Sequence, residues 1–265
     1  MLTPKKSLGQ NFLRDENIAR KIVESLHAQP NDVILEIGPG QGDLTKLLLE
    51  ASSTVVGVEV DPRASTILRE RFGPKLLLLQ QDVLTLGLEE ISKRYGRHPC
   101  VVGNIPYYIT SEILFWLFGQ RDYVQHATLM MQVEVAARLV AHTESKSYGI
   151  LSVFTQLYAD AKLLFKVSRN SFHPRPQVDS AVVRIEFGKS LPSANERLLR
   201  NIVRRTFSTR RKTIRNGLRM MGFTERQLEG VPFDFAKRPE QLSPSDSVHL
   251  SNLLEPYSAS LSMKF

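Results

Sequence analysis

The chain of 265 residues has only one cysteine and one tryptophan, and it has no long run of apolar residues. The lone Cys100 excludes a disulfide within the chain and any metal site built from several cysteines. A helix that spans a bilayer needs ~20 predominantly apolar residues, and no segment approaches this length. The segment Met1–Lys6 also lacks the apolar core and the cleavage site of a secretory signal. We therefore expect a cytoplasmic protein without a metal site.

Basic residues concentrate in the last third of the chain. The formal net charge is +8, and residues 188–265 contribute +7 of it, with 14 Lys and Arg against 7 Asp and Glu. The segment 196–219 holds nine basic residues and one acidic residue. A solvated charged face is the alternative explanation, but so uneven a distribution favours a polyanionic partner for this part of the chain.

Short apolar runs alternate with helical spacing over the first 187 residues. Strands that alternate with helices form a parallel sheet covered on both faces. Two later apolar runs predict an antiparallel addition at the sheet edge, so we expect an α/β fold with a Rossmann-like sheet. The predicted strands are 33–37, 54–58, 76–80, 100–103, 127–131, 152–157 and 180–187, and helical spacing occurs at 15–26, 44–50, 64–72 and 113–118.

A polar linker at 188–193 predicts a boundary between two domains, 1–188 and 189–265. The second domain is expected to be small, all-helical and basic. Its helix signals are a segment at 195–221 ended by Gly222, a segment at 225–228 with Thr224 as N-cap, and a segment at 246–254 with Ser245 as N-cap.

The motif Asn104, Ile105, Pro106 and Tyr107 closes the fourth apolar run of the expected sheet. An amide oxygen and the Ile105 carbonyl can accept the two hydrogens of an exocyclic amine, and the Tyr107 ring can stack on a flat base. The alternative is a structural turn, in which Pro106 ends the strand and Tyr107 covers the core. The motif alone does not decide between these two interpretations.

A glycine-rich turn and two acidic residues follow the first three strands in order. Gly38 and Gly40 lie in the turn after the first strand, and Glu36 is the second-last residue of that strand. Glu59 ends the second strand and can bind ribose hydroxyls, and Asp82 ends the third strand beside Val83 and can accept from an adenine amine. Because ligands of open α/β sheets bind along this edge, we expect a nucleoside cofactor. No second cation for a phosphate is evident, so S-adenosylmethionine fits better than a dinucleotide.

Together these motifs resemble those of the ribosomal RNA adenine dimethyltransferases, in particular the small-subunit branch (KsgA, or RsmA). The resemblance covers residues 9 to about 255, in order and without large insertions. It implies a class I, S-adenosylmethionine-dependent methyltransferase that dimethylates two adjacent adenines in the 3′-terminal hairpin loop of 16S rRNA during 30S subunit biogenesis. The motifs that carry it are Gly9–Leu13, Glu36–Gly40, Glu59, Gln81–Asp82, Asn104–Tyr107, Phe172–Ser180 and the basic segment 207–216.

The resemblance also assigns roles to single residues. It implies cofactor contacts for Asn11, Leu13, Gly38, Glu59, Asp82 and Asn104. Tyr107 would stack on one face of the target adenine, and Phe172 is a candidate for the other face, with core packing as its alternative role. Basic residues of the C-terminal helix would bind RNA phosphates: Arg204, Arg205, Arg210, Arg211, Lys212 and Arg215.

Three departures from the family pattern affect the expected RNA contacts. Tyr108 and Glu112 stand where family members often carry Asn and Pro, and Ile150 stands where a basic residue is expected. Two other functions remain open: methylation of large-subunit rRNA, as in the antibiotic-resistance branch, and a non-catalytic ribosome assembly factor. We expect a monomer that acts on an immature 30S particle.

Overall fold

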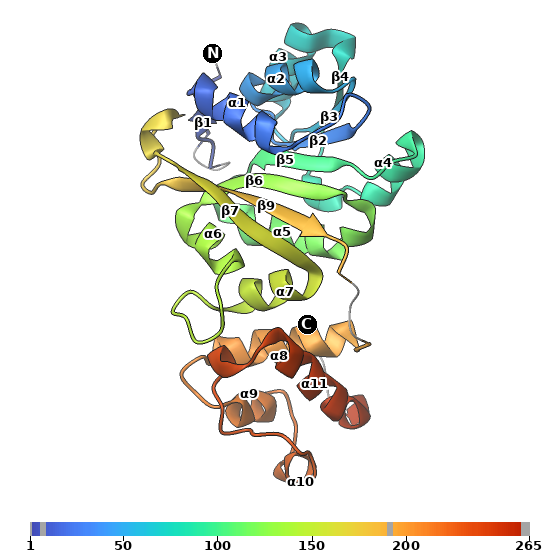
Figure 1. Ribbon diagram of the computed structural model, residues 1–265, viewed down its shortest axis with the longest axis vertical. Helices are drawn as coiled ribbons and strands as arrows, with labels where there is room; N and C mark the ends of the chain where they lie inside the picture. Colours follow the sequence, from blue (N-terminus) through green and yellow to red (C-terminus); the bar gives the residue numbers. More distant parts are fainter. Residues whose placement is uncertain (1, 6–8, 190–192, 261–265) are drawn as a thin grey trace. The chain divides into compact units, whose positions relative to one another are not determined.

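The computed structural model describes residues 2–5, 9–189 and 193–260, which fall into two compact units. One unit comprises Met1–Ala137 with Asp160–Gly188, and the other comprises Arg138–Ala159 with Lys189–Phe265 (Figure 1). The domain boundary at residue 188 remains a prediction. Residues 138–159 belong to the same compact unit as the C-terminal helices, whereas the sequence-based prediction assigned them to the first domain.

A sheet of seven strands forms the centre of the first unit. Strands β2 to β6 pair in parallel, and β9 pairs antiparallel with β6. The inner parallel strands β3, β2, β5 and β6 are fully or largely buried because both sheet faces are covered, which matches their mainly apolar sequences. In spatial order the strands are β4 (Leu76–Leu79), β3 (Thr54–Val58), β2 (Val33–Ile37), β5 (Cys100–Asn104), β6 (His126–Gln132), β9 (Ser180–Phe187) and β7 (Ala159–Val167).

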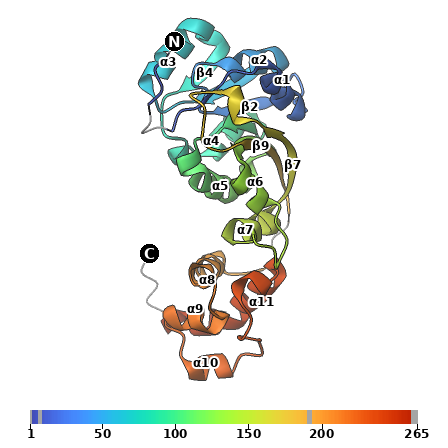
Figure 2. The same cartoon turned by 90° about the vertical axis from the view of Figure 1, so that its left-hand side faces the viewer.

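Helices cover both faces of the sheet. The helices α1 (Glu16–Ser25) and α2 (Asp43–Ala51) pack on one face through a buried cluster that includes Ile22, Leu48 and Val102. The helices α4 (Leu88–Tyr95) and α5 (Thr110–Gly119) lie on the other side of the sheet (Figure 2). Two further helices, α3 (Pro62–Phe72) and α6 (Val133–Leu139), precede residue 140.

One predicted strand is wrong. Residues 152–157 belong to the helix α7 (Ile150–Tyr158), and the strand β7 begins only at Ala159. The helix is buried nearly all round, and its few polar residues (Ser152, Thr155 and Gln156) do not form an exposed polar face. Periodicity does not separate such a helix from a buried strand. The alternating sequence of 159–167 is that of a half-exposed edge strand.

The second unit is helical, as predicted. Its helices are α7, α8 (Glu196–Ser208), α9 (Ile214–Met220), α10 (Glu225–Glu229) and α11 (Pro244–Leu254). They enclose an apolar core that includes Ile202, Leu218 and Leu250. The Thr224 side chain caps α10, as predicted, by accepting from the Gln227 amide. The cap of α11 is Ser243 rather than Ser245, because Pro244 occupies the first helical position, which tolerates its missing N–H.

No helix in the described part of the chain is long and apolar enough to cross a membrane.

Candidate active site

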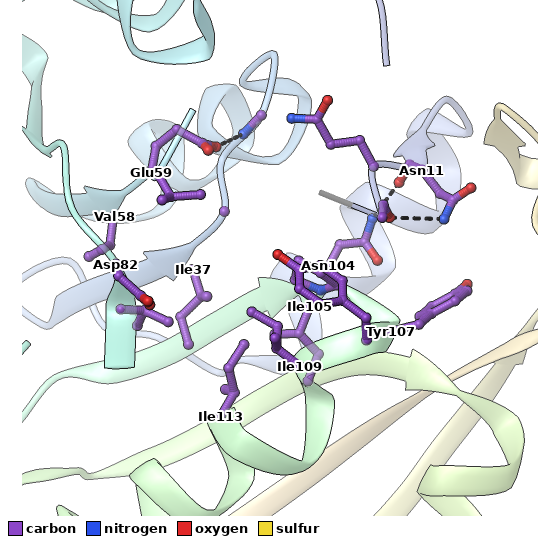
Figure 3. A pocket seen from close by; sticks show the side chains of 18 of the residues that line it. Asn11, Ile37, Val58, Glu59, Asp82, Asn104, Ile105, Tyr107, Ile109 and Ile113 are labelled. Atoms are coloured by element: carbon purple, nitrogen blue, oxygen red, sulfur yellow. Dashed lines mark hydrogen bonds between the residues drawn. The ribbon is translucent and has the colours of Figure 1, made fainter. Parts of the chain in front are cut away.

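A cavity of about 790 Å³, counting the space open to solvent, lies at the carboxyl ends of the parallel strands. Figure 3 shows its two ends: Glu59 and Asp82 lie at one end, Tyr107 lies at the other, and Asn104 stands between them. Most of the predicted cofactor and acceptor residues line it: Asn11, Gly38, Gly40, Glu59, Asp82, Val83, Asn104, Ile105, Pro106 and Tyr107.

The glycine turn after β2 leaves room for a ligand. Gly38 has a φ of +66°, and a Cβ atom placed on it would meet no atom within 4 Å, so its backbone faces open space. Gly40 also has a positive φ and lies against the Phe12 ring, where a Cβ atom would approach the ring to 3.0 Å. The turn therefore requires glycine for its conformation, and at Gly38 it exposes the backbone to the cavity.

Two carboxylates line the cofactor end of the cavity. Glu59 is 5% exposed and accepts hydrogen bonds from the amides of Gly40 (3.0 Å) and Asp61 (2.8 Å). Burial raises the pKa of Glu59, and the two amide hydrogen bonds oppose this shift. Asp82 accepts from the Leu84 amide at 2.9 Å and so begins a short 3₁₀ turn. Both carboxylates are thus held by backbone amides, which fixes acceptor oxygens at neighbouring strand ends.

Leu13 and Glu36 do not line this cavity but an adjoining one of about 420 Å³. The two cavities share Gly38, Gly40 and Asn104 in their linings. Glu36 is 2% exposed, and burial raises its pKa to about 8 although the Thr45 hydroxyl donates to it at 2.6 Å. Glu36 is therefore predominantly protonated at neutral pH, and it supplies a hydrogen-bond donor as well as an acceptor.

The Asn104 side chain is oriented by the N-terminal arm. Its Nδ2 donates to the backbone carbonyl of Asn11 at 2.9 Å, across 93 residues of sequence. The Asn11 side chain in turn donates to the Gly9 carbonyl at 3.1 Å. A carbonyl can only accept, so the nitrogen of the Asn104 amide must face Asn11 and the oxygen must point elsewhere.

Tyr107 is fixed by the start of β9, which lies beside the carboxyl end of β6. Its hydroxyl is 2.7 Å from the Ser180 hydroxyl at the start of β9, and Ser180 is fully buried. The Thr110 hydroxyl donates to the Pro106 carbonyl at 3.0 Å, which joins the motif to the first turn of α5. The ring of Tyr107 is thereby held at the wall of the cavity.

Phe172 is not brought into the cavity. It lies in β8 (Phe172–His173), which pairs antiparallel with β1 (Phe12–Leu13), and it is only 5% exposed. Its side chain belongs to the same buried cluster as Leu13 and Ile22. The conformation described thus matches the alternative role, core packing, because the short β-bridge turns the ring toward α1.

The N-terminal arm is anchored beside the cofactor end of the cavity. The Gln10 amide donates to Asp61 at 3.0 Å, and Arg63 donates both to Asp61 and to the Thr3 carbonyl. The hydrogen bond from Arg63 lowers the pKa of Asp61 to about 2, so this anchor stays charged over the physiological range.

Several lining residues were not predicted as site residues. They are mostly apolar side chains at strand ends and in the turn after β5: Gly9, Gln10, Phe12, Ile37, Val58, Val60, Gln81, Tyr108, Ile109 and Ile113. For most of them, a position directly beside a predicted residue was the available signal. Val60 follows Glu59, and Tyr108 follows Tyr107.

Two of the six predicted RNA-binding residues, Arg210 and Arg215, are partly buried, and both make contacts within the second unit. Arg210 donates to the carbonyls of Lys146 (3.0 Å) and Ser145 (3.2 Å). Arg215 forms an ion pair with Glu225 at 2.5 Å and lies over the Phe235 ring. These side chains stabilise the unit itself.

The other four predicted RNA-binding residues are exposed: Arg204, Arg205, Arg211 and Lys212. Arg205 also donates to the Met220 carbonyl at 3.3 Å. Arg197 and Arg200 were not predicted, although they precede Arg204 by seven and four positions, a spacing that places the three on one face of α8.

Residues 1–253 match the family model described as ribosomal RNA adenine dimethylase. The chain belongs to the ribosomal RNA adenine dimethylase family. This membership confirms the family and the enzyme class predicted from the motifs, a ribosomal RNA adenine dimethyltransferase.

Curated relatives and solved structures agree with this membership over nearly the full chain. Ribosomal RNA small subunit methyltransferase A of Salinibacter ruber (strain DSM 13855 / M31) is 43% identical over 257 residues, which cover 96% of this chain and 86% of the relative. A dimethyladenosine transferase from Plasmodium falciparum has a TM-score of 0.74 at 26% identity, and the match covers 94% of this chain and 98% of that one. The 23S rRNA methyltransferase ErmE has a TM-score of 0.65 at 27% identity, with 92% and 100% covered. The predicted fold class is confirmed by these structures.

Proposed function

We propose that this family member is a small-subunit rRNA methyltransferase that dimethylates adenine at N6. In this proposal it uses S-adenosylmethionine and acts in the cytoplasm, as a monomer, on two adjacent adenines of the 3′-terminal hairpin loop in an immature 30S particle. The observation that carries the proposal is the Asn104 amide, held at 2.9 Å by the Asn11 carbonyl between the carboxylates of the cofactor end and the Tyr107 ring. The small-subunit substrate named for the Salinibacter relative supports the choice of RNA.

The residues at the cofactor end suit S-adenosylmethionine. Glu59 is a buried acceptor placed to bind two ribose hydroxyls, and Asp82 is an acceptor for the adenine amine of the cofactor. Open space beside the Gly38 backbone and the adjoining cavity at Glu36 leave room for the amino-acid part. When bound, the cofactor supplies a methyl group already activated by its sulfonium.

The chain's own contribution is to prepare the acceptor amine. The N6 lone pair of adenine is delocalised into the ring, which makes it a poor nucleophile. The Asn104 oxygen and the Ile105 carbonyl can each accept one hydrogen of the amine, which draws the nitrogen toward tetrahedral geometry and localises the lone pair. Both oxygens also stabilise the positive charge that develops on the nitrogen. No strong base is needed, since the proton can leave after the nitrogen becomes cationic.

The aromatic ring of Tyr107 holds the extruded base. Removing a base from its stack costs a few kcal/mol, and stacking on an aromatic side chain returns ~1–3 kcal/mol. Since the Tyr107 hydroxyl is anchored at Ser180, the ring does not have to be ordered when the base arrives.

The second unit would supply affinity for the RNA backbone. Its exposed Arg204, Arg211 and Lys212 are placed to contact phosphates, which strengthens binding without specifying sequence. The N-terminal Lys5 is also exposed, whereas Lys6 lies outside the described residues.

The experiment that tests the substrate is mass mapping of methylated positions. The protein and S-adenosylmethionine are incubated with under-methylated small subunits and, separately, with large-subunit rRNA. We expect dimethyladenosine at two adjacent positions of the small-subunit RNA. Methylation confined to large-subunit RNA would instead indicate a large-subunit rRNA methyltransferase, the activity named for ErmE. Binding to the small subunit without methylation would favour an assembly factor.

The catalytic assignment is tested by Asn104→Ala. The variant should lose methyl transfer, because the amine loses an acceptor, while it retains binding to the small subunit through the basic unit. Filter binding and incorporation of labelled methyl groups measure the two properties separately. Transfer at close to the wild-type rate would refute the role of the amide.

A further inference from the structure

Two of the most exposed large hydrophobic side chains line the same cavity. Among the described residues, four such side chains are exposed: Val60 (52%), Tyr108 (53%), Val178 (41%) and Met220 (49%). Val60 and Tyr108 are both part of the active-site lining. Exposed apolar groups at the rim of a binding site mark surface that a ligand covers. We therefore expect a bound ligand to cover each of these two side chains.

The exposure of Val60 is explained by the proposed cofactor, which would cover this side chain when bound. Val60 directly follows Glu59, and it lines the cavity together with Asp82 and Val83. Tyr108 lies in the turn at the acceptor end, directly after Tyr107, in a short 3₁₀ segment (Tyr107–Ile109). Figure 3 shows Tyr107 at the end of the cavity away from Glu59 and Asp82. The partner of Tyr108 is therefore expected on the acceptor side.

The N-terminal arm holds Tyr108 in its exposed position. A Cβ atom on Gly9 would lie 2.9 Å from Cδ1 and 3.3 Å from Cε1 of Tyr108, so the ring rests on the bare backbone of Gly9. Gly9 has a φ of +56°, a conformation that other residues rarely adopt. Gly9 thus supports one edge of the ring while half of the residue stays open to solvent.

We propose that Tyr108 is a second stacking residue, which binds the nucleobase next to the target adenine. This inference rests on the proposed function, in which Tyr107 takes the target base itself. Two neighbouring bases of a single strand need two neighbouring aromatic faces, and base–aromatic stacking is the usual means of holding an unpaired strand. An apolar ring without an ion pair suits a base better than a phosphate, which the exposed cations of the second unit can bind.

The test measures kinetics on small subunits reconstituted from unmethylated rRNA transcripts. Tyr108→Ala should raise the KM for the particle about 5- to 30-fold, the lower part of the range for base–aromatic stacking. Tyr108→Phe keeps the ring and should stay within about twofold of wild type. The KM for S-adenosylmethionine should not change in either variant. Val60→Ala is the matched control at the other rim, and it should change the cofactor KM while leaving the particle KM unaffected.

A second arm identifies the bound base. Transcripts carry a purine or a uracil on the 5′ or the 3′ side of the adenine pair. The wild type should prefer a purine on one side, because a larger ring stacks better, and Tyr108→Ala should lose that preference. Wild-type preference that survives in Tyr108→Ala, an equal loss in Tyr108→Phe, or a rise in the cofactor KM would each overturn the assignment. If the wild type does not methylate the particles at all, it is the proposed function that fails, and not the role of Tyr108 alone.

Discussion

The hydrogen bond between Tyr107 and Ser180 predicts an asymmetric double-mutant cycle. Tyr107→Phe removes one hydroxyl and leaves the Ser180 hydroxyl fully buried with no described partner. Ser180→Ala removes the other hydroxyl and leaves that of Tyr107, a residue that is only half-buried and lines the cavity. The two substitutions break the same 2.7 Å contact but leave different polar groups unsatisfied.

The magnitudes follow from this difference. A buried polar group without a partner costs ~1–3 kcal/mol, whereas a neutral hydrogen bond that water can replace contributes ~0.5–1.5 kcal/mol. Tyr107→Phe should therefore lower the free energy of unfolding by more than Ser180→Ala. The double variant loses the contact only once, so its effect should be smaller than the sum of the two by ~1 kcal/mol.

The assay is equilibrium urea unfolding followed by tryptophan fluorescence. Trp116 is the only tryptophan and lies in α5 of the first unit, where its indole donates to the Leu86 carbonyl at 3.0 Å. Its emission therefore reports the unit that contains Tyr107 and Ser180. Tyr108→Phe removes an exposed hydroxyl at the next position and is the control for loss of a phenol oxygen alone. Additive effects of the two substitutions, or a larger effect of Ser180→Ala, would refute the reasoning.

Further predictions concern Glu36 and the basic turn between α8 and α9, which contains Arg210 and Arg211. The pKa of Glu36 is raised from 4.5 to about 8 in the folded state, so the folded chain binds its proton more tightly than the unfolded chain. Its contribution to stability is full below pH 4.5 and is lost as the pH rises toward 8, at up to ~1.4 kcal/mol per pH unit. Without cofactor, Glu36→Gln should flatten the fall of the urea midpoint between pH 5 and 8, and parallel curves would contradict the assignment. In the second unit, Arg210→Ala should lower the thermal midpoint measured by circular dichroism, because it removes two hydrogen bonds to backbone carbonyls. Arg211→Glu should leave that midpoint unchanged and reduce RNA affinity and its salt dependence, and equal RNA-binding losses in both variants would argue against this distinction.

Much of the fold followed from local patterns. The five parallel strands are short apolar runs, and their order along the chain with intervening helices allows few alternatives to a parallel sheet. The helix at 150–158 was missed because burial on all sides removes the polar face that would reveal its period. The N-cap of α11 was misplaced by two residues, since two serines flank Pro244 and only Ser243 precedes the first turn.

The site was predictable where it depends on strand ends and not where it depends on long-range contacts. Glu59, Asp82 and Asn104 end successive strands, so the topology alone brings them to one edge. The burial of Phe172 depends on its pairing with Leu13, and the anchoring of Arg210 depends on a loop 64 and 65 residues away. No local pattern in the sequence encodes these partners, so residue type alone could not separate a ligand contact from a structural one.

The contact between Asn104 and Asn11 gives a reason for an amide at the centre of the site. A carboxylate in its place would set an oxygen against the Asn11 carbonyl, and it would lack the donor that the arm requires. The nitrogen of the Asn104 amide donates to the Asn11 carbonyl of the arm, and its oxygen can accept a hydrogen from the target amine. Gly9 joins the same arrangement, because its carbonyl binds Asn11 and its backbone supports the Tyr108 ring. The arm that lines the cavity therefore also orients the Asn104 amide, which binds the target amine. Docking of the arm and formation of the acceptor pocket are thus coupled.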